Sequence, residues 1–269
     1  GASITLIGAK TTVHHNCIEG DSDEYGLLVN SPSSTIQLVS PLSKEKVAID
    51  NGGGGNWGVY GCRDINQIKT IPPTVTASSD PTPNNSTGRR DVLRTLPTFM
   101  QRQILAFFGY NDYTLTGQTC QYLHARWKEA VGNKQLPLFV PVDCKTLKEA
   151  VERVKKDDRL TTIVVGKGEH VVAVYKDEDE SDSDDSDETA EMNDLEIAST
   201  MNIVGDPGVA KEEIVVVGGI FFGKGIQGNC HLQHLTLRQA KAYGVYGASS
   251  FTMEDVLVEQ CDYGVVASG

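Results

Sequence analysis

The chain has 269 residues, which is enough for one or two domains with a sizeable core. No apolar run reaches the ~18 residues that a membrane span needs, and no basic patch with interleaved aromatic residues favours nucleic-acid binding. The formal net charge is −12, but residues 177–188 (DEDESDSDDSDE) hold nine acidic side chains, so the remainder is only mildly acidic.

Residues 1–71 are rich in Val, Ile, Thr and Gly, and short runs such as SITLIG and STIQLVS alternate with turn residues. This pattern predicts short β-strands. His14 and His15 fall within one such strand. Because neighbouring strand residues point to opposite faces, the two histidines are predicted not to chelate a metal together.

Residues 72–90 (PPTVTASSDPTPNNSTGRR) lack hydrophobic periodicity and predict a disordered linker. Residues 91–132 differ in character, and predict a small bundle of short helices that is too small to be stable alone. Its first apolar stripe at helical spacing consists of Met100, Ile104, Phe107 and Phe108.

Residues 137–269 return to a β pattern after one helix. Thr146 and Glu149 have the T-x-x-E spacing of a capping box. One helical face then carries Leu147, Ala150, Val151 and Val154. Short, glycine-punctuated strands follow, interrupted by the acidic residues 177–190. Because such a run cannot bury enough apolar surface, we predict a disordered insertion there.

The segment GKGIQGNC (223–230) matches the G-x-G-x-x-G spacing of a dinucleotide-binding loop. That loop requires a helix after the third glycine, but the residues after Gly228 favour strands. Tyr-Gly-Val recurs at 243–245 and 263–265, and Gly225 is assigned the place of Gly244 one repeat earlier, as a periodic turn residue. Dinucleotide binding is therefore rejected, and no cofactor is predicted.

The six cysteines lie far apart, with no C-x-x-C pair. This spacing argues against a zinc site and against a disulfide-dense secreted scaffold. We therefore expect buried free thiols in an intracellular protein, cytoplasmic or nuclear.

Repeats of 20–25 residues with stacked apolar strands predict a mostly β fold, a parallel β-helix, in which side chains are buried only against neighbouring turns of this solenoid. The helix at 146–156 is expected to cap its N-terminal end.

Residues 137–269 together with 1–71 resemble the right-handed parallel β-helix (pectate-lyase-like) superfamily. More narrowly, VHHNC, SSTIQLVSPLSKEKVAIDNGGGGNWG and INQIKTI look like a group of microalgal β-helix proteins. Residues 94–130 resemble an F-box, whose apolar anchors would fall on Leu96, Pro97, Ile104 and Leu105. By analogy, this second resemblance implies that these residues bind a Skp-type adaptor in a ubiquitin ligase.

The order of segments departs from that of these relatives, in which INQIKTI lies near the C-terminus. Here it comes early, which fits either a piece of a tandem array or a circular permutation. Residues 1–26 and 247–264 share Gly-Ala-Ser, a cysteine and Tyr-Gly. We therefore predict backbone pairing between residues 1–17 and 251–269 in one continuous solenoid, whereas a tandem fragment predicts two separate β pieces.

Enzymes with this fold act on polysaccharides through clustered carboxylates, assisted by His, Arg or calcium. Candidates for such chemistry are His231, His234, Arg238, Glu254, Asp255, Glu259 and Asp262. His234 and Glu254 are predicted to stack in adjacent turns. No paired-Asp or D-x-x-D motif supports catalysis, so a polar surface ladder is the preferred interpretation.

Three functions stay open. The preferred one is a non-catalytic protein-interaction module, an F-box-like segment joined to a β-helix recognition surface, with no catalytic or metal residue assigned. The second is a carbohydrate-active β-helix of the lyase, hydrolase or epimerase type. The third is a purely structural solenoid.

Overall fold

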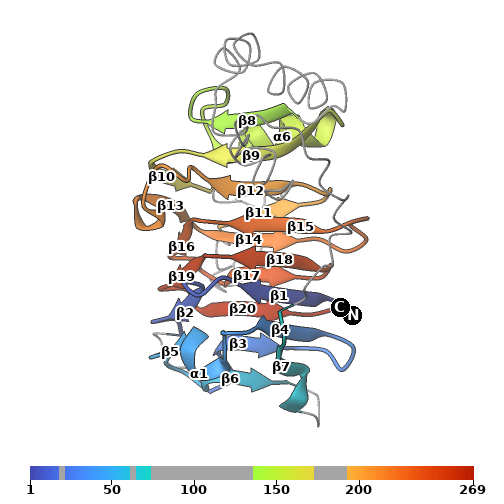
Figure 1. The fold of residues 1–269 in the computed structure, drawn as a ribbon, viewed down its shortest axis with the longest axis vertical. Coiled ribbons are helices and arrows are strands. Elements are labelled where there is room, and N and C mark those ends of the chain that lie inside the picture. Colours follow the sequence, from blue (N-terminus) through green and yellow to red (C-terminus); the bar gives the residue numbers. More distant parts are fainter. Residues whose placement is uncertain (18–21, 61–64, 74–135, 173–192) are drawn as a thin grey trace, which may run out of the picture.

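A computed structural model describes residues 1–17, 22–60, 65–73, 136–172 and 193–269. This part of the chain is mostly β, and its strands form three sheets in which all pairings are parallel (Figure 1). The mostly β, parallel character expected from the sequence is confirmed.

The three sheets run side by side along the long axis of Figure 1. The strands of the first sheet are given from the bottom of the figure upward, and those of the other two sheets from the top downward. The first has eight strands, in the order β7 (Ile68–Ile71), β4 (Thr35–Val39), β1 (Ser3–Ile7), β18 (Phe251–Glu254), β15 (Cys230–Gln233), β12 (Asn202–Gly205), β9 (Leu160–Val165) and β8 (Leu136–Val140). The second has six, in the order β10 (Gly168–Val171), β13 (Ile214–Val217), β16 (Thr236–Arg238), β19 (Leu257–Glu259), β2 (Thr12–His14) and β5 (Ala48–Ile49). The third has six, in the order β11 (Asp194–Ile197), β14 (Gly219–Phe222), β17 (Tyr243–Gly247), β20 (Tyr263–Ala267), β3 (Tyr25–Val29) and β6 (Gly55–Val59).

The chain visits the three sheets in rotation, so each turn adds one strand to each sheet. Alternating residues therefore form inward-facing ladders of apolar side chains. One such ladder in the first sheet runs through residues in register that are all buried: Ile163, Ile203, Leu232, Met253, Leu6 and Leu38. This alternation has the period of two of a β-strand, and it builds the core.

The first turn of the sequence lies against its last turn. Ile4 in β1 pairs with Phe251 in β18, and Val13 in β2 pairs with Val258 in β19. In Figure 1, the blue strand β1 lies directly between β18 and β4, and both chain ends lie side by side. The predicted pairing of residues 1–17 with residues 251–269 is confirmed, and two separate β pieces are excluded.

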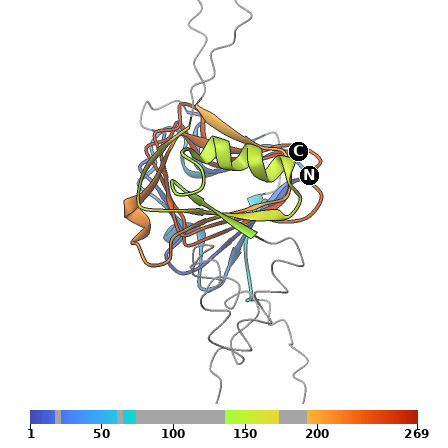
Figure 2. The same cartoon turned by 90° about the horizontal axis from the view of Figure 1, so that it is seen from above.

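The helix α6 (Leu147–Lys156) covers the end of the stack next to β8 and β9 (Figure 2). Thr146 is its N-cap and accepts a hydrogen bond from the Glu149 amide at 3.1 Å, while Glu149 Oε2 accepts from the Lys145 amide at 2.9 Å. All four apolar residues predicted for its inner face are buried. Both the helix and its apolar face were predicted correctly.

Two short helices, α1 (Lys44–Val47) and the 3₁₀ helix η1 (Ile65–Gln67), lie near the opposite end, and η2 (Lys211–Glu213) precedes β13.

The chain bends between sheets through columns of residues with left-handed backbone. The first corner, between the first and second sheets, consists of Gly8, Asp255 and His234, with φ angles of 82°, 52° and 54°. The second corner, between the second and third sheets, consists of His15, Asp50, Gln239 and Gln260, with φ between 52° and 58°. Asn, Asp and His are the non-glycine residues that adopt this conformation most readily.

The glycines of the Tyr-Gly repeat occupy strands, which corrects one prediction. Ile220 pairs with Val245, so Gly219 takes the place predicted for Gly225. Gly225 lies instead in the turn before β15, and a strand rather than a helix follows Gly228, which agrees with the rejection of dinucleotide binding. Gly264 is required by close approach: a Cβ there would lie 2.2 Å from the Gly26 carbonyl oxygen.

Several predictions lie outside the described residues. They are the linker at 72–90 (apart from Pro72 and Pro73), the helical segment 91–132 with its anchors Leu96, Pro97, Ile104 and Leu105, and the acidic insertion 177–190. Four of the six cysteines are described, and each of these four is a buried free thiol, as expected: Cys17, Cys144, Cys230 and Cys261. No helix in the described ranges is long and apolar enough to cross a membrane.

Candidate functional site

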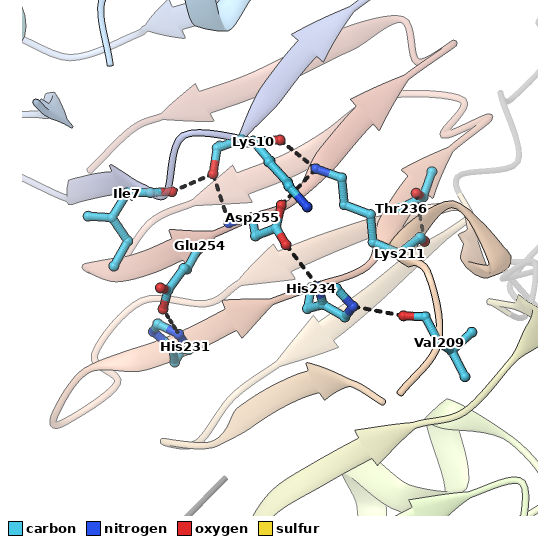
Figure 3. Close-up of polar contacts among 10 residues, drawn as sticks. Ile7, Lys10, Val209, Lys211, His231, His234, Thr236, Glu254 and Asp255 are labelled. Carbon is cyan, nitrogen blue, oxygen red and sulfur yellow. Dashed lines mark hydrogen bonds and ion pairs between the residues drawn. The ribbon is translucent and has the colours of Figure 1, made fainter. Parts of the chain in front are cut away.

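The first corner brings histidine, carboxylate and lysine side chains together (Figure 3). Because Gln233 pairs with Glu254, the next residues along, His234 and Asp255, lie in adjacent turns. The Nδ1 atom of His234 lies 2.8 Å from Oδ2 of Asp255. Lys211 Nζ lies 3.0 Å from the other carboxylate oxygen, Oδ1. The Lys211 side chain is 8% exposed, so it is a buried cation with one carboxylate as its counter-charge.

Both ring nitrogens of His234 have partners within the protein. Its Nε2 lies 2.9 Å from the Val209 carbonyl oxygen, which can only accept a hydrogen bond. Its Nδ1 faces the Asp255 carboxylate. Burial alone would raise the pKa of Asp255, but hydrogen bonds from His234 and Lys211, and their charges, outweigh it and lower this pKa. Both ring nitrogens of His234 are therefore engaged within the protein, one by a carboxylate and one by a backbone carbonyl.

The remaining polar atoms of the cluster are also paired internally. Lys211 Nζ donates to the Lys10 carbonyl, and the Lys211 carbonyl accepts from Thr236 Oγ1 at 3.0 Å. Thr11 Oγ1 donates to the Ile7 carbonyl and accepts from the Asp255 amide at 2.8 Å. A His–Asp pair orients a nucleophile in many hydrolases, but here the second ring nitrogen is used by a carbonyl. The cluster therefore links four successive turns of the stack by hydrogen bonds, those that carry Lys211, His234, Asp255 and Lys10.

The predicted partner of His234 was wrong by one residue. Glu254 lies next to His231, with Oε2 and Nε2 3.4 Å apart, and both side chains are about one-quarter exposed on the outer face of the first sheet. The repeat is 21 residues long here, as the pairing of Gln233 with Glu254 requires, so a spacing of 20 does not bring two residues into register.

The other predicted candidates do not join this cluster. Arg238 pairs with Glu169 across the second sheet, and Glu259 lies in register between Arg238 and His14. Asp262 follows the second corner, where its amide donates to the Ala240 carbonyl at 3.2 Å.

The two histidines of the VHHNC segment face each other, which overturns the prediction that they point apart. The strand β2 ends at His14, and His15 has a φ of 53° in the second corner. This change of backbone brings the Nδ1 atoms of the two rings to 2.6 Å, with the ring planes at 85°. Burial and the neighbouring His15 lower the pKa of His14.

Asp194 is a half-buried carboxylate near the second corner, and no ion pair to it is found among the described residues. It follows Asn193, whose Nδ2 donates to the Gln239 carbonyl at 3.0 Å. Its Oδ1 is buried and has no hydrogen-bond partner among the described residues. Burial raises the pKa of Asp194 to about 6. The pKa of Asp194 is therefore raised, whereas that of Asp255 is lowered, although both residues lie near a bend between sheets.

Aromatic side chains gather on the outer side of the third sheet. The rings of Phe221 and Tyr246 are stacked, with centroids 4.9 Å apart and planes at 8°. Tyr243 contacts both Tyr246 and Tyr263, at centroid distances of 4.9 and 5.1 Å. All four residues are partly exposed. We call these four residues the aromatic cluster.

Within the described residues, no group of three or more His, Cys, Asp and Glu side chains is arranged to hold a metal ion. Comparisons of the chain with protein-family models, with curated proteins and with solved structures found no match.

Proposed function

We propose that this chain is a non-catalytic protein-interaction module. In this proposal the three-sheet stack is a right-handed parallel β-helix that displays a recognition surface. Residues 91–132 bind a Skp-type adaptor through Leu96, Pro97, Ile104 and Leu105, and the whole acts as a substrate receptor of a ubiquitin ligase.

The aromatic cluster is the observation that carries the recognition part of this proposal. Aromatic residues are enriched at protein interfaces, because they bury a large area while keeping a polar group for hydrogen bonding. The four rings form a continuous chain of contacts, one stacked and two tilted, and all four residues are partly exposed, so they offer a preformed surface. A rigid aromatic surface also loses little side-chain entropy when it binds.

The state of the first corner supports a non-catalytic role. Its histidine, carboxylate and lysine are the residues that an acid–base mechanism would use, yet each is engaged in a contact within the protein. A general base needs a free nitrogen or oxygen within reach of a substrate proton. This cluster has none to offer on the His234 ring.

The adaptor part is tested with the full chain and a purified Skp-type adaptor by isothermal titration calorimetry. Truncating one apolar anchor commonly costs ~1–4 kcal/mol of binding. We therefore expect Leu96→Ala and Leu105→Ala to weaken binding about ten-fold or more. Tyr246→Ala is the matched control and leaves adaptor binding unchanged. Failure of the wild-type chain to bind the adaptor would remove this part of the proposal.

A carbohydrate-active function is the second candidate, and the His231–Glu254 pair favours it. The two side chains are partly exposed and adjacent on the outer face of the first sheet. Release of reducing ends from a panel of acidic polysaccharides, lost in Glu254→Gln, would support this function. Equal product formation by Glu254→Gln and wild type would exclude a role for this pair.

A further inference from the structure

The His14–His15 pair lies at the surface of the second corner and is not explained by the proposed interaction function. His14 is half-buried and His15 is exposed. Two adjacent residues of a regular strand cannot direct their rings to one point. The left-handed backbone of His15 removes that restriction, and the two Nδ1 atoms approach to 2.6 Å.

Convergent Nδ1 atoms are the donor arrangement of a chelate. In this structure the two atoms are close enough for one ring to donate a hydrogen to the other. A metal ion bound to both nitrogens at about 2.0–2.1 Å would hold them roughly 3 Å apart. Both rings lie at the surface, so small side-chain rotations open the pair by the few tenths of an ångström required.

Carboxylates are present in the turns on either side of the pair. Glu259 is in register with His14 on the adjacent strand β19. Asp50 follows Ile49, which is in register with His14 on β5, and its carbonyl oxygen accepts from the His15 amide at 3.2 Å. Both carboxylates lie close enough to favour a positive charge at His14, although they are not arranged with the two rings as a set of three metal ligands in this structure.

We propose that His14 and His15 form a two-histidine surface chelate for a divalent transition-metal ion, whose remaining coordination positions are filled by water. Imidazole nitrogens suit Cu²⁺, Zn²⁺ and Ni²⁺, and Cu²⁺ binds such sites most tightly among the first-row divalent ions. The site is an exposed one, with open coordination positions, rather than a closed structural zinc site.

The proposal is tested by titrating the full chain with Cu²⁺ alone and with Zn²⁺ alone, at about pH 7.5, where model histidines are mostly neutral. Saturable binding of one Cu²⁺ per chain is expected, with Zn²⁺ weaker. The variants are His14→Gln and His15→Asn, because asparagine also accepts the left-handed backbone at residue 15. Since even the loss of an outer partner weakens metal sites 10–100-fold, each variant should lose about ten-fold or more in Cu²⁺ affinity.

His231→Gln is the matched control, because it removes another partly exposed histidine beside a carboxylate. It should leave the tight Cu²⁺ site intact. Nitrogen couplings in the electron paramagnetic resonance spectrum should report two imidazole ligands in the wild type and one in either variant.

A measurement on the unmodified chain covers the case in which a variant fails to fold. Substoichiometric Cu²⁺ should broaden the ring resonances of His14 and His15 before those of His231. Unchanged affinity in both variants, or broadening of His231 first, would overturn the proposal.

Discussion

The two corners of the stack use the same backbone conformation but are held by different interactions. In the first corner, Asp255 contacts the ammonium group of Lys211 and the ring of His234. In the second corner, neutral amides take their place: Asn16 Nδ2 donates to Asn51 Oδ1 at 3.0 Å, and Asn16 Oδ1 accepts from the Cys261 amide at 3.0 Å. One corner therefore depends on charge and the other on amide hydrogen bonds and close packing.

This difference shows that the left-handed backbone at a bend does not determine which side-chain interactions stabilise that bend. A left-handed residue can be histidine, aspartate or glutamine, because what matters is a backbone that these residues tolerate. The neighbouring turn then decides whether its side chain is paired, as at His234, or left at the surface, as at His15. If backbone conformation and side-chain pairing are independent, substitutions at the two corners should have different effects on stability.

The largest effect is expected from Asp255→Asn, which leaves Lys211 buried without a counter-charge. Removing one partner of a buried ion pair costs 3–5 kcal/mol in well-buried cases, and we expect about 3 kcal/mol here. Urea unfolding would measure it. Asp50→Asn, at the same backbone conformation but exposed, is the control and should change stability by less than about 0.5 kcal/mol. Equal losses in both variants would contradict a charge-dependent first corner.

Gly264→Ala should lower the free energy of unfolding almost as much, through steric overlap alone. The added Cβ would lie 2.2 Å from the Gly26 carbonyl oxygen and 2.6 Å from Val13 Cγ1, next to the second corner. Overpacking of this kind costs about 1–3 kcal/mol. The loss should not depend on salt, unlike that of Asp255→Asn. Gly223→Ala, whose nearest contact would be at 3.4 Å, is the neutral control in the same thermal-melting assay.

Replacing each corner histidine by asparagine should separate the two corners directly. His234→Asn breaks the contacts to Asp255 and to the Val209 carbonyl, so a loss of about 1–2 kcal/mol is expected. His15→Asn keeps the left-handed backbone and loses only a surface contact, so the change should stay within about 0.5 kcal/mol. A larger loss for His15→Asn in chemical denaturation would reverse the comparison.

The smallest effect concerns the unpaired carboxylate near the second corner. Burial raises the pKa of Asp194 to about 6 from its ordinary 3.8, so the folded state prefers the protonated form. Its contribution to stability is therefore present at low pH and is lost as the pH rises from about 4 to 6. Because solvent reaches part of this group, we expect Asp194→Asn to stabilise the protein by only about 1 kcal/mol at neutral pH. The gain should vanish near pH 4.

The pH dependence of Asp255 has the opposite sign. The pKa of Asp255 is lowered, so its contribution to the free energy of unfolding is present above its ordinary value of 3.8 and is lost as the pH falls below that value.

Unfolding of wild type and Asp194→Asn, followed from neutral pH to pH 4, checks the Asp194 prediction. If the difference in the free energy of unfolding between these two proteins does not change with pH, burial does not destabilise the ionised form of Asp194.

Local patterns in the sequence were enough to predict some of this structure. The T-x-x-E cap with its four apolar residues predicted α6, because helix capping and amphipathicity are set within one short segment. The repeated Gly-Ala-Ser and Tyr-Gly segments predicted the pairing of β1 with β18, because identical turns stack in register.

The side-chain partners could not be predicted in the same way. A repeat of 21 rather than 20 residues moved the partner of His234 from Glu254 to Asp255. Lys211 was missed because Lys-Glu-Glu (211–213) reads as a solvated charged run, yet its ammonium group turns inward toward Asp255. The His14–His15 contact depends on the sign of one φ angle, for which the only sequence signal is the tolerance of histidine for left-handed backbone.

The position of the first turn in the stack has a consequence for how the protein folds. The Ser3 amide donates to Ser250 Oγ, a contact between residues 247 apart in the chain. Strands β1, β2 and β3 are synthesised more than 200 residues before the strands with which they pair on one side, β18, β19 and β20. Long-range pairing of this kind slows folding, because chain closure must precede the contacts that reward it. During synthesis, the edges of these three strands therefore stay unpaired and prone to aggregation until β18, β19 and β20 have been made.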